Sequence, residues 1–293
     1  MQSKVEHIPV FGIQLEVLRI PVPAGSARCA PIVFLHDGLG SVAMWQGKTG
    51  SHGGYCPAQV CAALGRPGIV YSRQGYGQSD PVPDVRSPSC EANGQRQGRL
   101  RADYMHREAY EILPELLRLL GAERPLLLGH SDGASIALLH ASRFDVEACI
   151  AMAPHVMVED ISLRAIEQIR RDYEQPASKL RERLARYHAD VDCAFWQWNE
   201  VWLSEAFRSF DIRADCARIT APVLAIQGCD DAYGTMEQVD AIARALSGAN
   251  FKKNNPEPAM DGRIVLQKLE HCGHSPHKDQ AELVLGIMKA TFL

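Results

Sequence analysis

Short apolar runs of strand length alternate along the chain with stretches in which apolar residues recur every three or four positions. The middle runs are apolar throughout rather than alternating, which is typical of parallel strands covered by helices on both faces. We predict strands at residues 13–20, 31–35, 68–71, 125–129, 148–152, 223–228 and 264–269. Residues 102–120 and 235–246 have amphipathic helical spacing, and Pro114 should kink or split the first helix. This alternation predicts an α/β fold with a doubly wound, mostly parallel sheet.

One long segment interrupts the alternation of strands and helices. Residues 155–216 are charged and helix-patterned, contain no strand-like run, and hold three of the four tryptophans of the chain. We therefore expect a helical cap at 155–216, inserted between a first core part at 1–154 and a second core part at 217–293. Two stretches rich in proline, glycine or asparagine, 80–99 and 248–262, are expected as loops.

Composition narrows the class of protein further. The 293 residues carry 31 Lys and Arg against 35 Asp and Glu, a net charge of −4, and 46% of them are apolar. This balance excludes a disordered chain and gives no basic face for nucleic acid. No apolar run reaches the roughly 18–20 residues needed to cross a membrane, and the first residues lack the apolar core of a signal peptide. Nine cysteines without a C-x-x-C pair favour free thiols. We expect a cytoplasmic protein whose partner is a small-molecule substrate.

The clearest chemical signal is Gly-His-Ser-Asp-Gly at 129–133, which follows an apolar strand and precedes a run of small residues. A sharp strand-to-helix turn pushes the serine side chain outward, and glycines on both sides avoid clashes at that turn. The N–H groups that open the helix then point at incoming negative charge. Ser131 is therefore predicted as a nucleophile.

A serine nucleophile needs a base, and the base needs an acid that orients it. The strand at 223–228 ends before Asp231, and the strand at 264–269 is followed by His274, which comes directly after a glycine in a short loop. The carboxyl ends of parallel strands meet at one edge of a sheet. We expect Ser131, Asp231 and His274 to converge there.

Other candidates remain for both partners. The base could be His271 or His277 instead. The acid could be Asp230, or it could follow the strand at 148–152, as Glu159 or Asp160.

The strand at 31–35 runs into His-Asp-Gly-Leu-Gly at 36–40, a loop whose small residues can aim backbone N–H groups at developing negative charge. We expect an oxyanion hole formed by the N–H of Gly38 or Leu39 together with that of Asp132. His36 is expected to be structural, and the Asp132 side chain is expected to favour the positive end of its helix.

Taken together, these motifs resemble the α/β-hydrolase superfamily over nearly the whole chain. The resemblance rests on the H-D-G-L-G loop at 36–40, Y-S-R-Q-G-Y-G-Q-S-D at 71–80, G-H-S-D-G at 129–133, G-C-D-D at 228–231 and G-H at 273–274. The first loop is similar to the H-G-G-P-G loop of proline iminopeptidase-like members. The resemblance implies Ser131 as nucleophile, Asp231 as acid, His274 as base, and a helical cap that shapes the substrate pocket.

We therefore expect a serine hydrolase that cleaves an ester, thioester, lactone or amide of a small, apolar substrate without a metal or cofactor. The aromatic cap and the chain after the strand at 148–152 supply candidate pocket residues, namely Trp196, Trp198, Trp202 and His155. A carbon–carbon bond hydrolase or an acyltransferase could use the same three residues. The alternative from another class is a non-catalytic protein that binds a small molecule.

Overall fold

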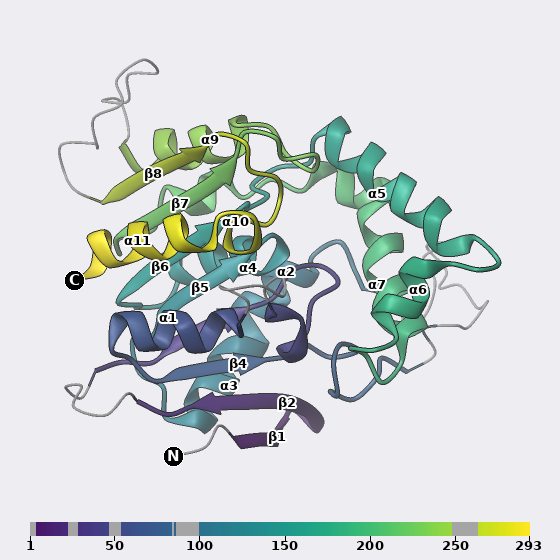
Figure 1. The fold of residues 1–293 in the computed structure, drawn as a ribbon, viewed down its shortest axis with the longest axis horizontal. Coiled ribbons are helices and arrows are strands. Elements are labelled where there is room, and N and C mark those ends of the chain that lie inside the picture. Colours follow the sequence, from purple (N-terminus) through teal and green to yellow (C-terminus); the bar gives the residue numbers. More distant parts are fainter. Residues whose placement is uncertain (1–3, 23–28, 47–53, 84, 86–99, 248–262) are drawn as a thin grey trace.

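The computed structural model describes residues 4–22, 29–46, 54–83, 85, 100–247 and 263–293. Its centre is one eight-stranded sheet with the order β1-β2-β4-β3-β5-β6-β7-β8 (Figure 1). The strands are β1 (Lys4–Val10), β2 (Ile13–Ile20), β3 (Ile32–Leu35), β4 (Gly68–Tyr71), β5 (Leu126–His130), β6 (Ala148–Met152), β7 (Val223–Gly228) and β8 (Ile264–Leu269). Strands β3 to β8 are parallel, whereas β1 and β2 pair antiparallel. The predicted α/β class and mostly parallel sheet are confirmed.

Helices cover both faces of this sheet. The helices are α1 (Cys56–Leu64), α2 (Tyr104–Arg107), α3 (Leu113–Leu120), α4 (Asp132–Ala141), α5 (Asp160–Glu174), α6 (Lys179–Leu184), α7 (Val191–Trp202), α8 (Arg213–Cys216), α9 (Glu237–Ser247), α10 (Pro276–Asp279) and α11 (Ala281–Phe292), with shorter turns η1 (Val42–Trp45), η2 (Glu108–Ile112) and η3 (Glu205–Ser209). Figure 1 shows α1 and α11 on one face of the sheet, with α3 and α4 behind the strands.

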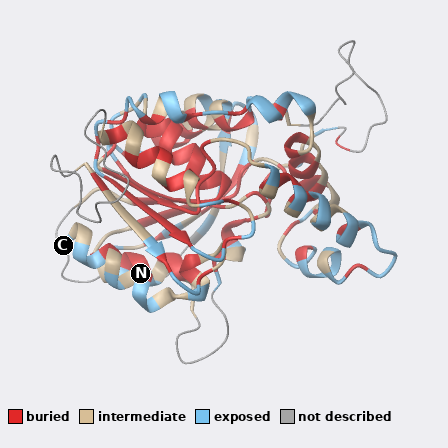
Figure 2. Ribbon diagram, turned by 90° about the horizontal axis from the view of Figure 1, so that it is seen from above, coloured by how far each residue is buried: buried red, intermediate tan, exposed pale blue. Residues whose placement is uncertain are grey.

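Successive residues of one strand enter opposite hydrophobic layers. In β3, Val33 and Leu35 join the cluster that contains α3, α4 and α9, whereas Ile32 and Phe34 join the cluster of α1 and α11. Side chains alternate across a strand, so a strand with a helix on each face must be apolar at every position. Figure 2 shows these strands as the most buried part of the molecule.

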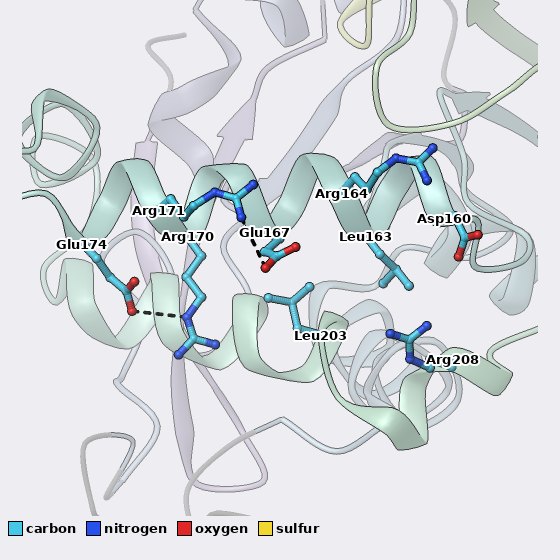
Figure 3. Close-up of a pocket in the computed structure, with 9 residues that line it drawn as sticks. All are labelled: Asp160, Leu163, Arg164, Glu167, Arg170, Arg171, Glu174, Leu203 and Arg208. Carbon is cyan, nitrogen blue, oxygen red and sulfur yellow. Dashed lines mark hydrogen bonds and ion pairs between the residues drawn. The ribbon is translucent and has the colours of Figure 1, made fainter.

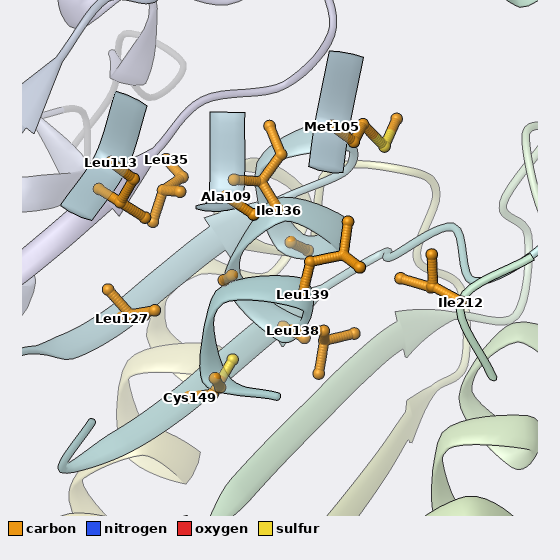
Figure 4. Packing of buried hydrophobic residues seen from close by; sticks show 14 of the residues in the cluster. Leu35, Met105, Ala109, Leu113, Leu127, Ile136, Leu138, Leu139, Cys149 and Ile212 are labelled. Carbon is orange, nitrogen blue, oxygen red and sulfur yellow. The ribbon is translucent and has the colours of Figure 1, made fainter. Parts of the chain in front are cut away.

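The amphipathic stretch 102–120 is split where proline interrupts it. It forms α2, the π-turn η2 and α3, with Pro114 in the first turn of α3. Proline has no backbone N–H to donate to the carbonyl four residues earlier, and its ring crowds that carbonyl. The wider π-turn relieves the contact. The split keeps Met105, Ala109 and Leu113 packed in the same cluster as Leu139 of α4 (Figure 4).

Between β6 and β7 the chain makes a largely helical excursion. It comprises α5, α6, α7, η3 and α8, and an isolated antiparallel bridge between Met157 and Asp211 joins its two ends. Figure 1 shows α5, α6 and α7 beyond the carboxyl ends of the parallel strands. Its role as a cap, and the division of the chain into two core parts and a cap, stay predictions.

The structure contains one strand that was not predicted, and the two predicted loops lie mostly outside the described residues. β1 is missing from the predicted strands, because Pro9 and the charged residues of this edge strand hide its pattern. It pairs with β2 through a turn at Phe11 and Gly12, both with positive φ. Most of the predicted loop at 80–99 and all of that at 248–262 lie outside the described residues.

Candidate active site

The predicted nucleophile sits in a tight turn between a strand and a helix. β5 ends at His130 and α4 begins at Asp132, so Ser131 alone makes the turn, with φ 54° and ψ −122°. A β-carbon on Gly129 would overlap the carbonyl of Gly133, and one on Gly133 would overlap the end of β3. The close approach of backbone on both sides explains why the turn needs both glycines.

Two further loops bring a histidine and an aspartate to the serine. Asp231 follows β7 and His274 follows β8. The Nε2 of His274 lies 2.9 Å from the Oγ of Ser131, and its Nδ1 lies 2.9 Å from each carboxylate oxygen of Asp231. An ionised carboxylate only accepts, so Nδ1 carries a proton and Nε2 is left to accept the serine proton. The geometry is therefore that of a nucleophile, a base and an orienting acid.

The carboxylate of Asp231 is buried and held from several sides. The amide of Gln227 donates to its Oδ2 at 3.1 Å, and the backbone N–H of Tyr233 donates to its Oδ1 at 2.8 Å. Burial works against the charged form, but the hydrogen bonds from His274 and Tyr233 hold the pKa of Asp231 below its ordinary value. The carboxylate of Asp231 is therefore ionised at neutral pH.

The alternative acids and bases lie elsewhere. Asp230 is exposed, and Glu159 accepts hydrogen bonds from the loop after β7. Asp160 is the first residue of α5. His271 is exposed, and His277 is buried in α10. None of these five side chains has a hydrogen bond to the serine or to His274 among the described residues.

The loop after β3 leaves one backbone N–H available near the nucleophile. The N–H of Leu39 donates to Oδ1 of Asp37 at 3.1 Å, so Leu39 is already engaged. The N–H of Gly38 has no acceptor among the described residues. The N–H of Asp132 belongs to the first turn of α4, where helical N–H groups lack intrahelical acceptors. Of the two predicted donors in this loop, Leu39 is engaged and Gly38 is not, and the oxyanion hole of Gly38 or Leu39 with Asp132 stays a prediction.

A buried arginine orients this loop. The guanidinium of Arg73 donates to the carbonyl oxygens of His36 at 2.7 Å and Asp37 at 2.8 Å. The backbone N–H of Arg73 donates to Nε2 of His36, whose Nδ1 in turn donates to the carbonyl of Asp37. His36 is thus structural, as predicted. Since both carbonyls point at Arg73, this set of bonds fixes the orientation of the peptide planes that precede Gly38.

One imidazole joins the loop after β3 to the loop that carries the base. Nε2 of His130 lies 2.7 Å from the backbone carbonyl oxygen of His274, and its Nδ1 lies 3.4 Å from Oδ2 of Asp37. Burial opposes the charge on Asp37, but the pairing with His130 and the charge of Lys278 hold the pKa of that carboxyl well below its usual range. His130, the residue before the nucleophile, therefore contacts both the loop after β3 and the loop after β8.

The side chain of Asp132 lies in the first turn of α4, which is the positive end of that helix. It accepts the hydroxyl proton of Tyr104 at 2.5 Å. Tyr104 itself accepts the indole N–H of Trp202 at 3.1 Å, which links α4 to α7. Burial raises the pKa of Asp132 to about 6, although Arg73 and Tyr104 oppose the shift. Forcing a charge into this site costs stability.

Replacing Asp132 with asparagine should stabilise the protein at high pH only. The pKa of this carboxyl is about 6 when folded and 3.8 in its ordinary state. The folded state thus binds the proton more tightly, and wild-type stability falls as pH rises from about 4 to 6. Asp132→Asn should raise the free energy of unfolding by about 1–3 kcal/mol at pH 8 and leave it nearly unchanged at pH 4. Urea unfolding at the two pH values measures this difference, and an equal effect at both would contradict it.

Two of the four predicted pocket residues lie beside the site. His155 follows β6, and its ring centroid is 5.6 Å from that of His274. Burial, aided by the charge of His274, lowers the pKa of His155 to about 3, so its ring is neutral. Trp198 of α7 lies against Gly38, where a β-carbon would come within 2.6 Å of its Cδ1.

The other two tryptophans are placed differently. Trp202 is buried, packs on His155 at 4.9 Å between ring centroids, and uses its N–H on Tyr104. Trp196 contacts α5, with the guanidinium of Arg170 5.4 Å from its ring centroid. Residues two apart on a helix point about 200° from each other, so Trp196 and Trp198 cannot both face the nucleophile. Trp196 therefore faces α5, and its place in a substrate pocket stays a prediction.

Three residues around the site were not predicted. Arg73 lies in the 71–80 stretch that carries part of the family resemblance, but no role was predicted for it. Tyr233 comes two residues after the acid, and its ring centroid is 4.6 Å from that of His274. Tyr104 gave no signal, because only the packing of α2 against α4 brings it to Asp132.

A separate groove of about 590 Å³ lies along α5, away from these residues (Figure 3). Its lining is strongly charged and mostly paired, with Arg170 bonded to Glu174 and Arg171 to Glu167. Leu163 and Leu203 form the apolar part of its wall. Because acidic and basic groups alternate along it, the groove does not select a ligand of one charge.

Two further observations concern metals and membranes. Within the described residues, no group of three or more His, Cys, Asp or Glu is placed to hold a metal ion. Among the helices of the described ranges, none is long and apolar enough to span a bilayer. The expectations of no cofactor, of no membrane or nucleic-acid partner and of a cytoplasmic location stay predictions.

Comparisons with known proteins place this geometry in a family. No curated protein sequence matches the chain significantly. Among solved structures, the enol-lactonase from Burkholderia xenovorans LB400 is similar at 16% identity and a TM-score of 0.61, covering 98% of this chain and 99% of that one. A thermophilic esterase from Thermogutta terrifontis is similar at 16% identity and a TM-score of 0.62, covering 99% and 97%. A meta-cleavage product hydrolase from Pseudomonas fluorescens IP01 is similar at 13% identity and a TM-score of 0.59, covering 98% and 97%.

At these identities the solved structures show the shared fold alone. The sequence itself carries the assignment, because residues 32–286 match the pattern of the Alpha/beta hydrolase family. That span includes every strand from β3 to β8, the loop after β3 and all three converging residues. The chain therefore belongs to the alpha/beta hydrolase family.

Proposed function

We propose that this protein hydrolyses carboxylic esters of small molecules through an acyl-enzyme on Ser131. The observation that carries the proposal is the continuous chain of hydrogen bonds from Ser131 Oγ through His274 to Asp231, each at 2.9 Å. Such a chain turns a weakly nucleophilic hydroxyl into an attacking group. The similarity to an esterase and an enol-lactonase supports an acyl substrate.

The reaction would proceed in two half-reactions. Ser131 Oγ attacks the ester carbonyl carbon while His274 Nε2 takes the hydroxyl proton, and the negative oxygen rests against the N–H groups of Gly38 and Asp132. The carbon–oxygen bond to the alcohol then breaks as His274 returns its proton to that oxygen. Water repeats the sequence, with His274 as base, and releases the acid. Each oxyanion donor is expected to contribute about 3 kcal/mol to the transition state.

The walls near the nucleophile favour a small, largely apolar acyl group. Trp198 stands beside the oxyanion loop, the half-buried Leu39 belongs to that loop, and Tyr233 stands beside the base. His155 is neutral and adds no charge. We therefore expect esters with an uncharged acyl chain of short to medium length to react faster than esters whose acyl chain carries a charge.

A covalent probe and an ester panel test the proposal together. A fluorophosphonate should label the wild-type protein at one residue, which peptide mass spectrometry should identify as Ser131. The same protein should hydrolyse 4-nitrophenyl acetate, butanoate or octanoate with saturable kinetics, and Ser131→Ala should lose both reactions. Absence of labelling together with absence of turnover across the panel would overturn the proposal.

Replacing Gly38 with alanine should impair turnover through the oxyanion loop. A β-carbon there would lie 2.6 Å from Cδ1 and 2.8 Å from Cε2 of Trp198, so the loop or α7 must shift. A displaced donor costs about 100- to 1000-fold in kcat. Gly286→Ala is the matched control, because a β-carbon at Gly286 meets nothing within 4 Å. Steady-state kinetics measure both, and a Gly38→Ala variant within threefold of wild type would show that the loop tolerates the change.

A further inference from the structure

The indole N–H of Trp198 lies next to the predicted oxyanion donor. A β-carbon built on Gly38 would meet Nε1, Cδ1 and Cε2 of Trp198, which is the pyrrole edge of the ring. Adding a bond of about 1.5 Å places that edge within about 4 Å of the Gly38 α-carbon. The indole N–H of Trp198 in α7 and the backbone N–H of Gly38 therefore lie close together.

This indole N–H has no internal acceptor. An indole can only donate, and no hydrogen bond to an acceptor is formed by Trp198 within the described residues, although the residue is 6% exposed. Trp202, one turn further along α7, donates to Tyr104 instead. The N–H of Trp45 is sealed in the core, whereas that of Trp198 keeps accessible surface beside the oxyanion loop. The indole N–H of Trp198 is thus a nearly buried donor without a partner, and an acceptor atom of a bound ligand could pair with it.

The nearby acceptors are already occupied. Oδ1 of Asp37 accepts the N–H of Leu39, and the carboxylate of Asp132 accepts the hydroxyl of Tyr104. The backbone N–H of Gly38 and the indole N–H of Trp198 are therefore two donors in one region that have no acceptor among the described residues. A substrate whose acyl group carries a second carbonyl oxygen, close to the one in the oxyanion hole, would satisfy the indole.

We propose that Trp198 is a specificity-determining residue, whose indole N–H donates to a second carbonyl oxygen in the acyl group, as in esters of 3-oxo acids. This inference rests on the proposed function and adds a substrate class to it. A site built to bond a carbonyl discriminates against the analogue that lacks it, because the donor then stays unpaired.

Two esters of equal length test the inference. Methyl 3-oxopentanoate and methyl pentanoate are compared by pH-stat kinetics in the wild type and in Trp198→Phe. The wild type should prefer the oxo ester, and Trp198→Phe should reduce that preference about tenfold, which is the value of one hydrogen bond. The readout is the ratio of the two kcat/KM values, because removing the indole also changes the wall beside Gly38 and can alter both values together. Trp196→Phe, on the same helix but against α5, is the control and should keep the wild-type preference.

The outcomes separate this inference from the proposed function. An unchanged preference in Trp198→Phe, or an equal loss on both esters, would overturn the role of the indole while leaving ester hydrolysis intact. If the wild type hydrolyses neither ester, binding of the two product acids to Ser131→Ala by calorimetry decides. Tighter binding of 3-oxopentanoate that disappears in Ser131→Ala/Trp198→Phe would support the inference, and equal binding would overturn it.

Discussion

Replacing Ser131 with alanine is expected to lower kcat by about a millionfold. The substitution removes the hydroxyl that donates its hydrogen bond to Nε2 of His274, and with it the oxygen that would carry the acyl group. The base and the oxyanion donors would remain in place, so residual turnover should come from binding and polarisation of the ester alone. KM should change little, because the serine oxygen contributes mainly to the transition state.

The control for this prediction is a serine that plays no part in the site. Ser209 is exposed, and its hydroxyl donates only to the carbonyl of Ala206, so Ser209→Ala should leave kcat unchanged. Both variants should unfold at temperatures within a few degrees of wild type. A Ser131→Ala protein that kept a tenth of the wild-type kcat would show that another group is the nucleophile.

Replacing Asp231 with asparagine should lower kcat by about ten-thousandfold. The Asn amide would turn its NH₂ toward Nδ1 of His274, and the imidazole would then place its proton on Nε2. A protonated Nε2 cannot accept the proton of Ser131, although the shape of the site is unchanged. Steady-state kinetics at saturating ester measure the loss.

The neighbouring Asp230 provides a matched control. It has the same side chain one position earlier but is exposed, and its backbone N–H bonds to the carbonyl of Cys272. Asp230→Asn should retain wild-type kcat within about twofold. If Asp230→Asn were inactive and Asp231→Asn active, the acid would have been misassigned.

Local patterns were enough to predict most of the sheet. Strands such as β3 and β6 are apolar at every position because both of their faces are covered, and that pattern is readable without any tertiary information. The three converging residues were readable too, because each stands in the turn or loop that follows a strand, and those strand ends must reach the same edge of the sheet.

The supporting contacts could not be predicted in this way. Arg73 reaches the carbonyls of His36 and Asp37 only because β3 and β4 are neighbours in a particular register. The rotation of α7 about its own axis decides that Trp198 faces the oxyanion loop and Trp196 does not. Such choices depend on how whole elements pack, which a periodicity along one segment does not encode.

The contacts of His130 determine how the site should lose its structure on heating. A single ring side chain touches both the loop of the base and the loop of the oxyanion donor, and it is covalently adjacent to the nucleophile. The three parts should therefore loosen together on heating, as one cooperative unit rather than in stages. Partially disordered intermediates that retain a fraction of the activity should be rare, and inactivation should be steep in temperature even if distant helices fray gradually.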